Sequence, residues 1–244
     1  MSLQESLRFD SFVSIMTAHL LDNPIWSSLT TKHASFAVMQ SSAGRYPPQI
    51  APFAAVSAGH ASVLPQLEVL INGGESVYLV GVAPEFGAGW RVESAFPIPQ
   101  LVCSTPAVVR SGPEAVTLTE AHRTDMLALT ALVFPGFFRA RTVEMGRYIG
   151  IYHGRVLAAM AGERMRLDGY QEISAVCTHP EFIGRGYAQR LVGLLMNAVL
   201  ERGDTPFLHT HRENTRALSL YDRLGFKIRT QVMLWLVTRD RTTR

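Results

Sequence analysis

The sequence predicts an α/β (α+β) protein of two successive domains, and three observations support this prediction. The chain has 244 residues, of which 47% are hydrophobic and 18% charged, a composition typical of compact globular proteins. In the second half, segments with strand and helix periodicity alternate at short spacing. A cluster of Pro, Ser and Gly at residues 103–116 lies between apolar runs, so we predict domains at residues 1–105 and 112–244.

The first half mixes helix and strand signals. Apolar Phe12, Ile15 and Met16 recur at helical spacing within residues 9–22, and the NPIW that follows interrupts the pattern. The segment ESVYLVGVAP, residues 75–84, predicts a strand ended by proline. This half carries no motif that indicates a particular chemistry.

The second half contains a regular series of predicted elements. The first of these are a strand at 115–120, a helix at 121–133, two strands within 147–167 joined by a turn at His153 and Gly154, and a strand at 170–180 stopped by Pro180. A helix follows a glycine turn and ends at Gly203; its apolar face comprises Ala188, Leu191, Val192, Leu195, Ala198 and Val199. The last elements are a strand at 205–211, a short helix within 213–226 that has Asn214 as a candidate N-cap and stops at Gly225, and a strand at 227–237.

Composition and charge disfavour several classes of function. Residues 109–244 contain 19 Lys or Arg and 13 Asp or Glu, a net charge of +6, whereas residues 1–108 contain 4 and 7, a net charge of −3. A polyanionic small ligand suits the basic half better than nucleic acid, because no aromatic-plus-basic motif is present. No apolar run approaches the roughly 20 residues that span a bilayer. The N-terminus also lacks the pattern of a secretory signal, so we expect a soluble, cytoplasmic protein with no membrane partner.

Gly184 and Gly186 precede the amphipathic helix, and this arrangement favours anion binding. The first N–H groups of a helix have no intrahelical partner, and glycine lets the backbone approach an anion without a Cβ in the way. The P-loop is excluded because no Gly-Lys-Ser/Thr follows, and the dinucleotide fingerprint lacks its third glycine and its acidic residue at a strand end. An ordinary turn before a helix is the alternative.

Two motifs in this order, PEFIGRGYA at 180–188 and NTRALSLYDRLGF at 214–226, resemble those of the GNAT superfamily of acyl-CoA-dependent N-acyltransferases. The resemblance covers about Tyr148 to Ile228. The phrases EISAVCTHP and PFLHT are most similar to the branch related to glycine N-acyltransferases. The resemblance implies a mixed, largely antiparallel twisted sheet flanked by helices, and a degenerate copy of the same fold in the N-terminal half.

The resemblance also implies a coenzyme A site. The backbone at Val176, Cys177 and Thr178 would bind the pantetheine arm, and Asn214 would reach the same cofactor. The pyrophosphate would lie on the backbone of the turn, which comprises Ile183, Gly184, Arg185, Gly186, Tyr187 and Ala188. Family members usually have Arg or Gln where this chain has Ile183, so we expect weaker binding, with Arg185 available to help.

The chemistry implied is direct attack of an amine on acetyl-CoA, or on another short acyl-CoA, within a ternary complex. Tyr221 would protonate the departing thiolate, and the alternative is a core tyrosine. Glu172 shares strand parity with Val176 and is the candidate base, the alternative being a surface glutamate. Cys177 is expected to pack or to contribute backbone rather than act as a nucleophile, and it and Cys103 should be buried thiols in a reducing compartment.

Several matters stay open from the sequence. His209 and His211 lie on one strand face, but two ligands make a poor metal site, so we expect structural histidines and no metal. The acceptor amine and the acyl chain length are undetermined, and both a monomer and a homodimer are possible. The alternatives to an enzyme are a non-catalytic acyl-CoA-binding or sensing module and a nucleic-acid-binding protein.

Overall fold

The computed structural model describes residues 19–241. Phe12, Ile15 and Met16, on which the first predicted helix rests, lie outside these residues. The end of that segment, Leu20–Asp22, forms a single 3-10 turn.

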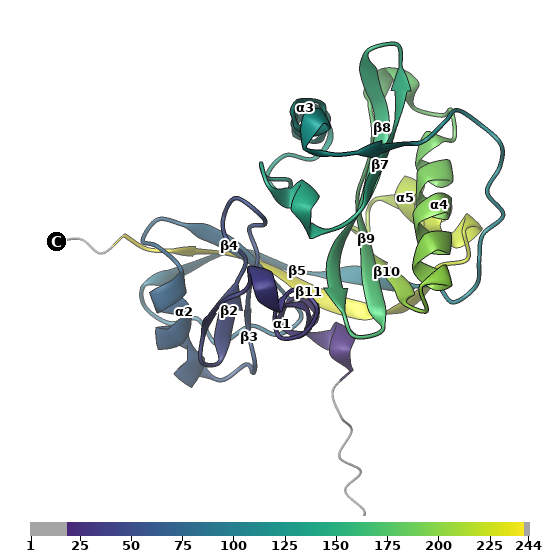
Figure 1. The fold of residues 1–244 in the computed structure, drawn as a ribbon. Helices are drawn as coiled ribbons and strands as arrows, with labels where there is room; N and C mark the ends of the chain where they lie inside the picture. Colours follow the sequence, from purple (N-terminus) through teal and green to yellow (C-terminus); the bar gives the residue numbers. More distant parts are fainter. Residues whose placement is uncertain (1–18, 242–244) are drawn as a thin grey trace, which may run out of the picture.

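An eight-stranded sheet is the central element of the fold (Figure 1). In spatial order it comprises β4 (Ser76–Val80), β11 (Lys227–Arg239), β5 (Trp90–Val102), β10 (Thr205–His209), β9 (Tyr170–Thr178), β8 (Val156–Leu167), β7 (Tyr148–His153) and β6 (Val116–Leu118). Only β9 and β10 pair in parallel, and all other neighbours are antiparallel. The mixed, largely antiparallel sheet expected from the resemblance is therefore confirmed.

Helices cover both faces of this sheet at β7, β8 and β9. Figure 1 shows α4 (Tyr187–Glu201) on one side and α3 (Arg123–Val133) on the other. The alternation of side chains along β7 explains the two cores, because neighbouring residues of a strand face opposite sides. Ile149 packs in the core beneath α4, whereas Tyr148 packs in the core beneath α3. The predicted apolar face of α4 holds, with Leu191, Val192, Leu195 and Val199 buried.

The N-terminal half forms a second, smaller sheet that sequence analysis missed. It comprises β1 (Val38–Gln40), β2 (Ala43–Arg45) and β3 (Ala54–Val56), with α1 (Pro24–Leu29) and α2 (Leu64–Leu70) beside them. The NPIW segment begins α1 rather than interrupting a helix, because Pro24 occupies the first turn, where its missing N–H is not needed. The predicted strand at 75–84 ends at Val80, before the predicted proline stop. Gly81 follows with a φ of 82°, and a Cβ there would lie 1.9 Å from the carbonyl oxygen of Asp22.

Strand β5 joins the two halves of the chain. It comes from the first half, yet it lies between β11 and β10 of the second. The sequence did not indicate this strand, because it contains Pro97 and Pro99 and proline is rare in central strands. The register explains these prolines: β10 pairs with β5 only at Gln100, Leu101 and Val102, so Pro97 and Pro99 lie beyond its end, where the carbonyl of Pro99 accepts one bond of 3.2 Å from the N–H of Thr210.

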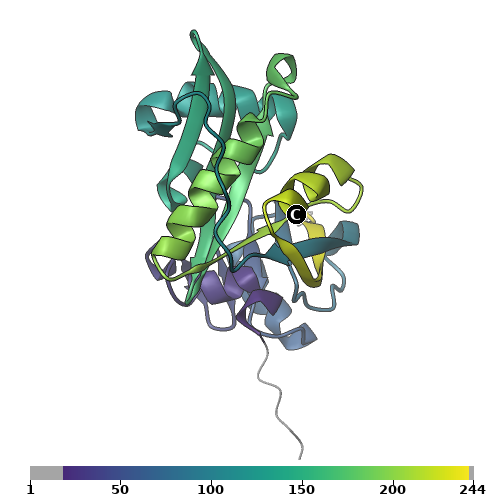
Figure 2. The same ribbon diagram turned by 90° about the vertical axis from the view of Figure 1, so that its right-hand side faces the viewer.

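The linker at residues 105–112, where we predicted the domain boundary, connects β5 to β6. Both of these strands belong to the eight-stranded sheet. Figure 2 shows this linker crossing in front of α4. None of the helices within residues 19–241 combines the length and apolar character needed to cross a membrane.

Candidate functional site

The centre of the sheet opens where β9 and β10 separate. These parallel strands pair at only three positions, the last of which joins Glu172 to Phe207. Beyond it, β9 contains a bulge: Ser174 and Cys177 face Gly162 and Met160 on β8, and between them Ala175 has a φ of 51°. A left-handed alanine is strained and bulges re-aim the backbone. The strand segment at Val176 therefore leaves the ladder and lines a cavity on each side.

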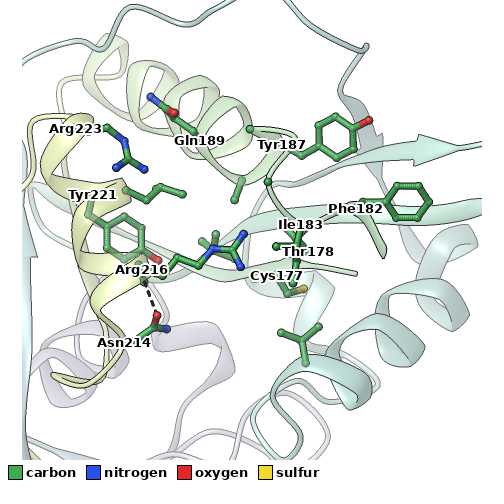
Figure 3. A pocket seen from close by; sticks show the side chains of 17 residues that line it. Cys177, Thr178, Phe182, Ile183, Tyr187, Gln189, Asn214, Arg216, Tyr221 and Arg223 are labelled. Atoms are coloured by element: carbon green, nitrogen blue, oxygen red, sulfur yellow. Dashed lines mark hydrogen bonds between the residues drawn. The ribbon is translucent and has the colours of Figure 1, made fainter. Parts of the chain in front are cut away.

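The first cavity has a volume of about 510 Å³ and is formed by the end of β9, the turn before α4, and α5 (Thr215–Arg223). Ten of the residues predicted for the site line it (Figure 3): Val176, Cys177, Thr178, Ile183, Gly184, Gly186, Tyr187, Ala188, Asn214 and Tyr221. They come from three separate elements. The fold thus gathers the two sequence motifs and the strand around one space.

The two glycines of the turn are needed for backbone conformation. Gly184 and Gly186 have φ values of 86° and 78°, and a Cβ on either would meet no protein atom within 4 Å. Left-handed φ, rather than clearance from protein atoms, is therefore the reason for glycine here. The first bond of α4 runs from the N–H of Arg190 to the carbonyl of Gly186. The N–H groups of residues 187–189 consequently have no intrahelical acceptor and are free for an anion.

Two basic side chains that were not among the predicted site residues reach the first cavity from α5. Arg216 and Arg223 line it from α5, together with Leu220. Their spacing of i, i+4 and i+7 places them on one helix face, so the signal was present in the sequence. Arg185, by contrast, lies outside the lining, and its guanidinium stacks on the ring of Phe182 at 5.1 Å. The arginines that line the first cavity are therefore those of α5 and not Arg185.

Tyr221 lies on α5 at the junction of the two cavities and lines both. Its side chain is 6% exposed, and within residues 19–241 its hydroxyl has no hydrogen-bond partner. Burial raises the pKa of Tyr221 to about 12, so the phenol stays protonated at neutral pH. Asn214 caps α5 as predicted, accepting a bond of 3.1 Å from the N–H of Ala217 (Figure 3), and it also lines both cavities.

Both cysteines are free and buried, as the sequence analysis expected. Burial raises the pKa of the Cys177 thiol to about 12. The thiolate is the nucleophilic form of cysteine. A protonated, enclosed thiol therefore fits a packing role for Cys177 beside the first cavity.

The second cavity has a volume of about 410 Å³ and lies on the other side of Tyr221. It shares four residues with the first: Val133, Val176, Asn214 and Tyr221. The N-terminal half contributes Phe53 and Val80, and β5 contributes Phe96 and Ile98. No sequence motif marks these residues, because only the tertiary structure brings them beside β9.

Glu172 does not fit the role of general base that the sequence analysis gave it. It lines neither cavity, and its side chain is 1% exposed. Arg164 donates two bonds of 2.7 Å to its two carboxylate oxygens, and Nδ1 of His209 lies 2.9 Å from Oε1. Burial raises the pKa of Glu172, but Arg164 and His209 outweigh this effect and lower it to about 2.

A base needs a pKa near the working pH and reach to the proton that it takes. Glu172 has neither, and it is not the surface glutamate of the alternative interpretation either. The structure instead makes it the buried counter-ion of Arg164. Strand parity grouped Glu172 with Val176, but the bulge at Ala175 breaks this parity, because Ile173, the neighbour of Glu172, packs with Val176 in the core beneath α4. The sequence also could not show that Arg164 of β8 would pair with Glu172.

His209 and His211 both line the second cavity. Both ring nitrogens of His209 are engaged, with Glu172 at 2.9 Å and with Nε2 of Gln100 at 3.0 Å. His211 is exposed at the rim, with its ring 5.1 Å from that of Phe96. Residues 19–241 contain no cluster of three or more His, Cys, Asp or Glu side chains suited to a metal ion.

A family model described as FR47-like protein matches residues 148–236. The chain is 33% identical to a solved structure from Novosphingobium aromaticivorans that is assigned to the acetyltransferases of the GNAT family. That match has a TM-score of 0.84 and covers 91% of this chain and 100% of that one. No curated protein matches the chain.

More distant solved structures show a likeness of fold alone. A GCN5-related N-acetyltransferase-like protein from Streptococcus suis is 18% identical, with a TM-score of 0.54 over 87% of this chain and 93% of that one. A GNAT-family acetyltransferase from Colwellia psychrerythraea is 11% identical, with a TM-score of 0.53 over 90% and 97%.

Proposed function

This chain belongs to the GNAT family of acetyltransferases, and from that premise we propose that it transfers an acetyl group from acetyl-CoA to an amine by direct attack in a ternary complex. One observation carries the proposal. The two cavities meet at Tyr221, so a thioester entering from one side and an amine entering from the other would come together at a protonated hydroxyl. Holding two reactants in this way removes much of the entropic cost of their encounter.

The first cavity supplies the chemistry that coenzyme A needs. The free N–H groups of residues 187–189 and the positive end of the α4 dipole suit the pyrophosphate. The unpaired backbone at Val176 suits the amides of the pantetheine arm. Arg216 and Arg223 add positive charge on the opposite wall and compensate for the apolar Ile183. Acetyl-CoA would supply the activated carbonyl carbon.

Tyr221 would act as the acid. The amine nitrogen forms a bond to the carbonyl carbon, the carbon–sulfur bond breaks, and Tyr221 donates its phenolic proton to the departing sulfur. The amine must lose a proton as it attacks. No Asp or Glu is among the described residues that line the second cavity, and both nitrogens of His209 are occupied. We therefore assign the proton to Nδ1 of His211 in place of Glu172; this nitrogen accepts a bond of 3.3 Å from the N–H of Glu213, at the exposed rim, and would release it on taking the proton.

The roles of Arg216 and Arg223 give a direct prediction. We expect Arg216→Gln and Arg223→Gln each to raise the KM for acetyl-CoA by about 3- to 10-fold, as is typical for loss of one charged hydrogen bond at an exposed site. The effect should shrink as salt is added, because exposed charges are screened. Steady-state kinetics at two ionic strengths measures it. Arg212→Gln is the control, since Arg212 precedes α5 and lines neither cavity.

The enzyme must be distinguished from an acyl-CoA sensor with the same fold. We expect acetyl-CoA to raise the melting temperature, because a ligand that binds only the folded state stabilises it. We also expect free CoA to be released when a panel of primary amines is added. Stabilisation by acetyl-CoA with no release on any amine would favour the sensor. Salt-dependent oligonucleotide binding without any effect of acetyl-CoA would instead favour a nucleic-acid-binding protein.

Several finer assignments stay predictions from the sequence. These are the branch related to glycine N-acyltransferases, the origin of the N-terminal half as a degenerate copy of the fold, the two-domain division, the cytoplasmic location, a homodimeric state and the absence of a nucleic-acid partner. The acyl group is proposed to be acetyl, and a different short acyl-CoA is tested by the same release assay.

A further inference from the structure

The second cavity has an aromatic wall. Four phenylalanines line it, namely Phe53, Phe96, Phe134 and Phe137. Phe96, Phe134 and Phe137 are only half-buried, so part of each ring is left open. A pocket of this volume, largely apolar and with a few polar groups, is typical of small-molecule sites.

The aromatic wall is held in place by packing behind it. The ring of Phe137 lies 4.5 Å from that of Tyr78 and 6.2 Å from that of Phe53. On the other side, Phe96 lies opposite Leu234 in the β5–β11 ladder, and its ring contacts His211. Because Phe96 lies on β5 and Phe137 packs against Tyr78 of β4 and Phe53, an apolar ligand meets rings that are already packed, which favours binding.

The charge in this cavity disfavours acceptors with several cationic groups. Arg164 lines it, with its guanidinium 4.7 Å from the centre of the Phe53 ring, and the carboxylate that neutralises it is buried behind the wall. Glu213 is the nearest carboxylate at the rim, 4.0 Å from Nδ1 of His211, and it is exposed to solvent. A second ammonium group would therefore lose water without gaining a buried counter-ion.

We propose that the acceptor is a primary amine carried on an aromatic or similarly bulky apolar group, and that residues of the N-terminal half select it. This inference rests on the proposed acetyl transfer at the same site. The amine would lie near Tyr221 and His211, and the apolar group would lie against Phe96 and Phe137. The first half of the chain, for which the sequence indicated no chemistry, thus contributes to acceptor specificity through Phe53 and Phe96, together with Phe134 and Phe137 of the second half.

The test compares amines that differ in the apolar group they carry. The amines also differ in whether that group belongs to a simple amine, an amino acid or a peptide. With acetyl-CoA saturating, we expect kcat/KM for 2-phenylethylamine to exceed that for n-propylamine and for spermidine by at least about 10-fold, the range over which an apolar pocket discriminates by size. L-Phenylalanine and a peptide that begins with phenylalanine distinguish an amine, an amino acid and a protein N-terminus as sources of the same chemistry. Equal or better turnover of spermidine or n-propylamine would overturn the proposal while leaving the acetyltransferase intact.

A variant tests the aromatic wall itself. Phe96→Ala should lower the ratio of kcat/KM for 2-phenylethylamine to that for n-propylamine by about 10-fold. A ratio of rates is insensitive to partial loss of folded protein. Phe86→Ala is the matched control, because Phe86 belongs to an aromatic cluster with Trp90 and Trp235 and lines neither cavity. An unchanged ratio in Phe96→Ala would contradict the assignment.

A binding measurement, which needs no turnover, separates the proposed acetyl transfer from the proposed acceptor site. In the presence of CoA, calorimetric titration should detect binding of 2-phenylethylamine and weaker binding of spermidine. Binding of the aromatic amine without acetyl transfer would contradict the proposed function but support the acceptor site. Acetyl transfer to other amines with no binding of 2-phenylethylamine would support the proposed function but contradict the acceptor site.

Discussion

Replacing Tyr221 with phenylalanine is expected to lower kcat by roughly 10²- to 10⁴-fold, the usual contribution of a positioned general acid. The change removes one hydroxyl and retains the ring, which packs 5.9 Å from Phe226 in the core beneath α4. Since that hydroxyl has no hydrogen-bond partner within residues 19–241, stability should be nearly unchanged. The dissociation constant for acetyl-CoA should also stay the same, because the proton is needed only as the thiolate leaves.

The raised pKa of Tyr221 adds a pH test. Because burial raises this pKa to about 12, the phenol stays protonated across the neutral range, and loss of the acid should not limit kcat there. Tyr170→Phe is a matched control, since its hydroxyl bonds to His19 and lies outside both cavities. A Tyr221→Phe enzyme with kcat within twofold of the parent would contradict the acid role.

Replacing Glu172 with glutamine is expected to lower the free energy of unfolding by about 3–5 kcal/mol, as when one partner of a buried ion pair is removed. The variant leaves the Arg164 guanidinium buried without its counter-ion. Urea unfolding at pH 7 measures the loss, and Glu201→Gln at the exposed end of α4 is the control. Combining Glu172→Gln with Arg164→Met should restore part of the stability, because no unpaired buried charge then remains.

The pH dependence of this contribution follows from the pKa of Glu172. The paired carboxylate titrates at about 2 in the folded protein, against an ordinary value of 4.5. Its contribution is therefore complete above about pH 4.5 and disappears as the pH falls towards 2. The stability difference between the parent and Glu172→Gln should narrow over that window. A variant that keeps its stability but loses more than about 100-fold in kcat would return Glu172 to the role of base.

The surroundings of Glu172 show what the sequence could not reveal about the site. The bulge at Ala175 breaks the strand parity that linked Glu172 to Val176, and the pKa of a carboxylate depends on its neighbours in space. Arg164 lies on β8 and His209 on β10, so both reach Glu172 across the sheet. Nothing in the spacing of these residues along the chain indicates a bidentate contact.

The N-terminal half illustrates a second limit. Its short strands and the prolines of β5 give little periodicity, so the segment that contains Phe96 and Ile98 had no predicted structure. It becomes a strand because β11 pairs along its length, and the register places both prolines where β10 does not pair. Partner strands far away in the sequence therefore decided its conformation.

The sequence by itself determined the order of elements in the second half, the amphipathic face of α4, the Asn214 cap and the glycine turn. These depend on contacts between near neighbours in the chain, where periodicity and backbone preference act directly. The tertiary structure decided which side chains share a cavity. It brought Arg216, Arg223 and the phenylalanines of the first half to the opening between β9 and β10, because burial and charge pairing depend on distance in space.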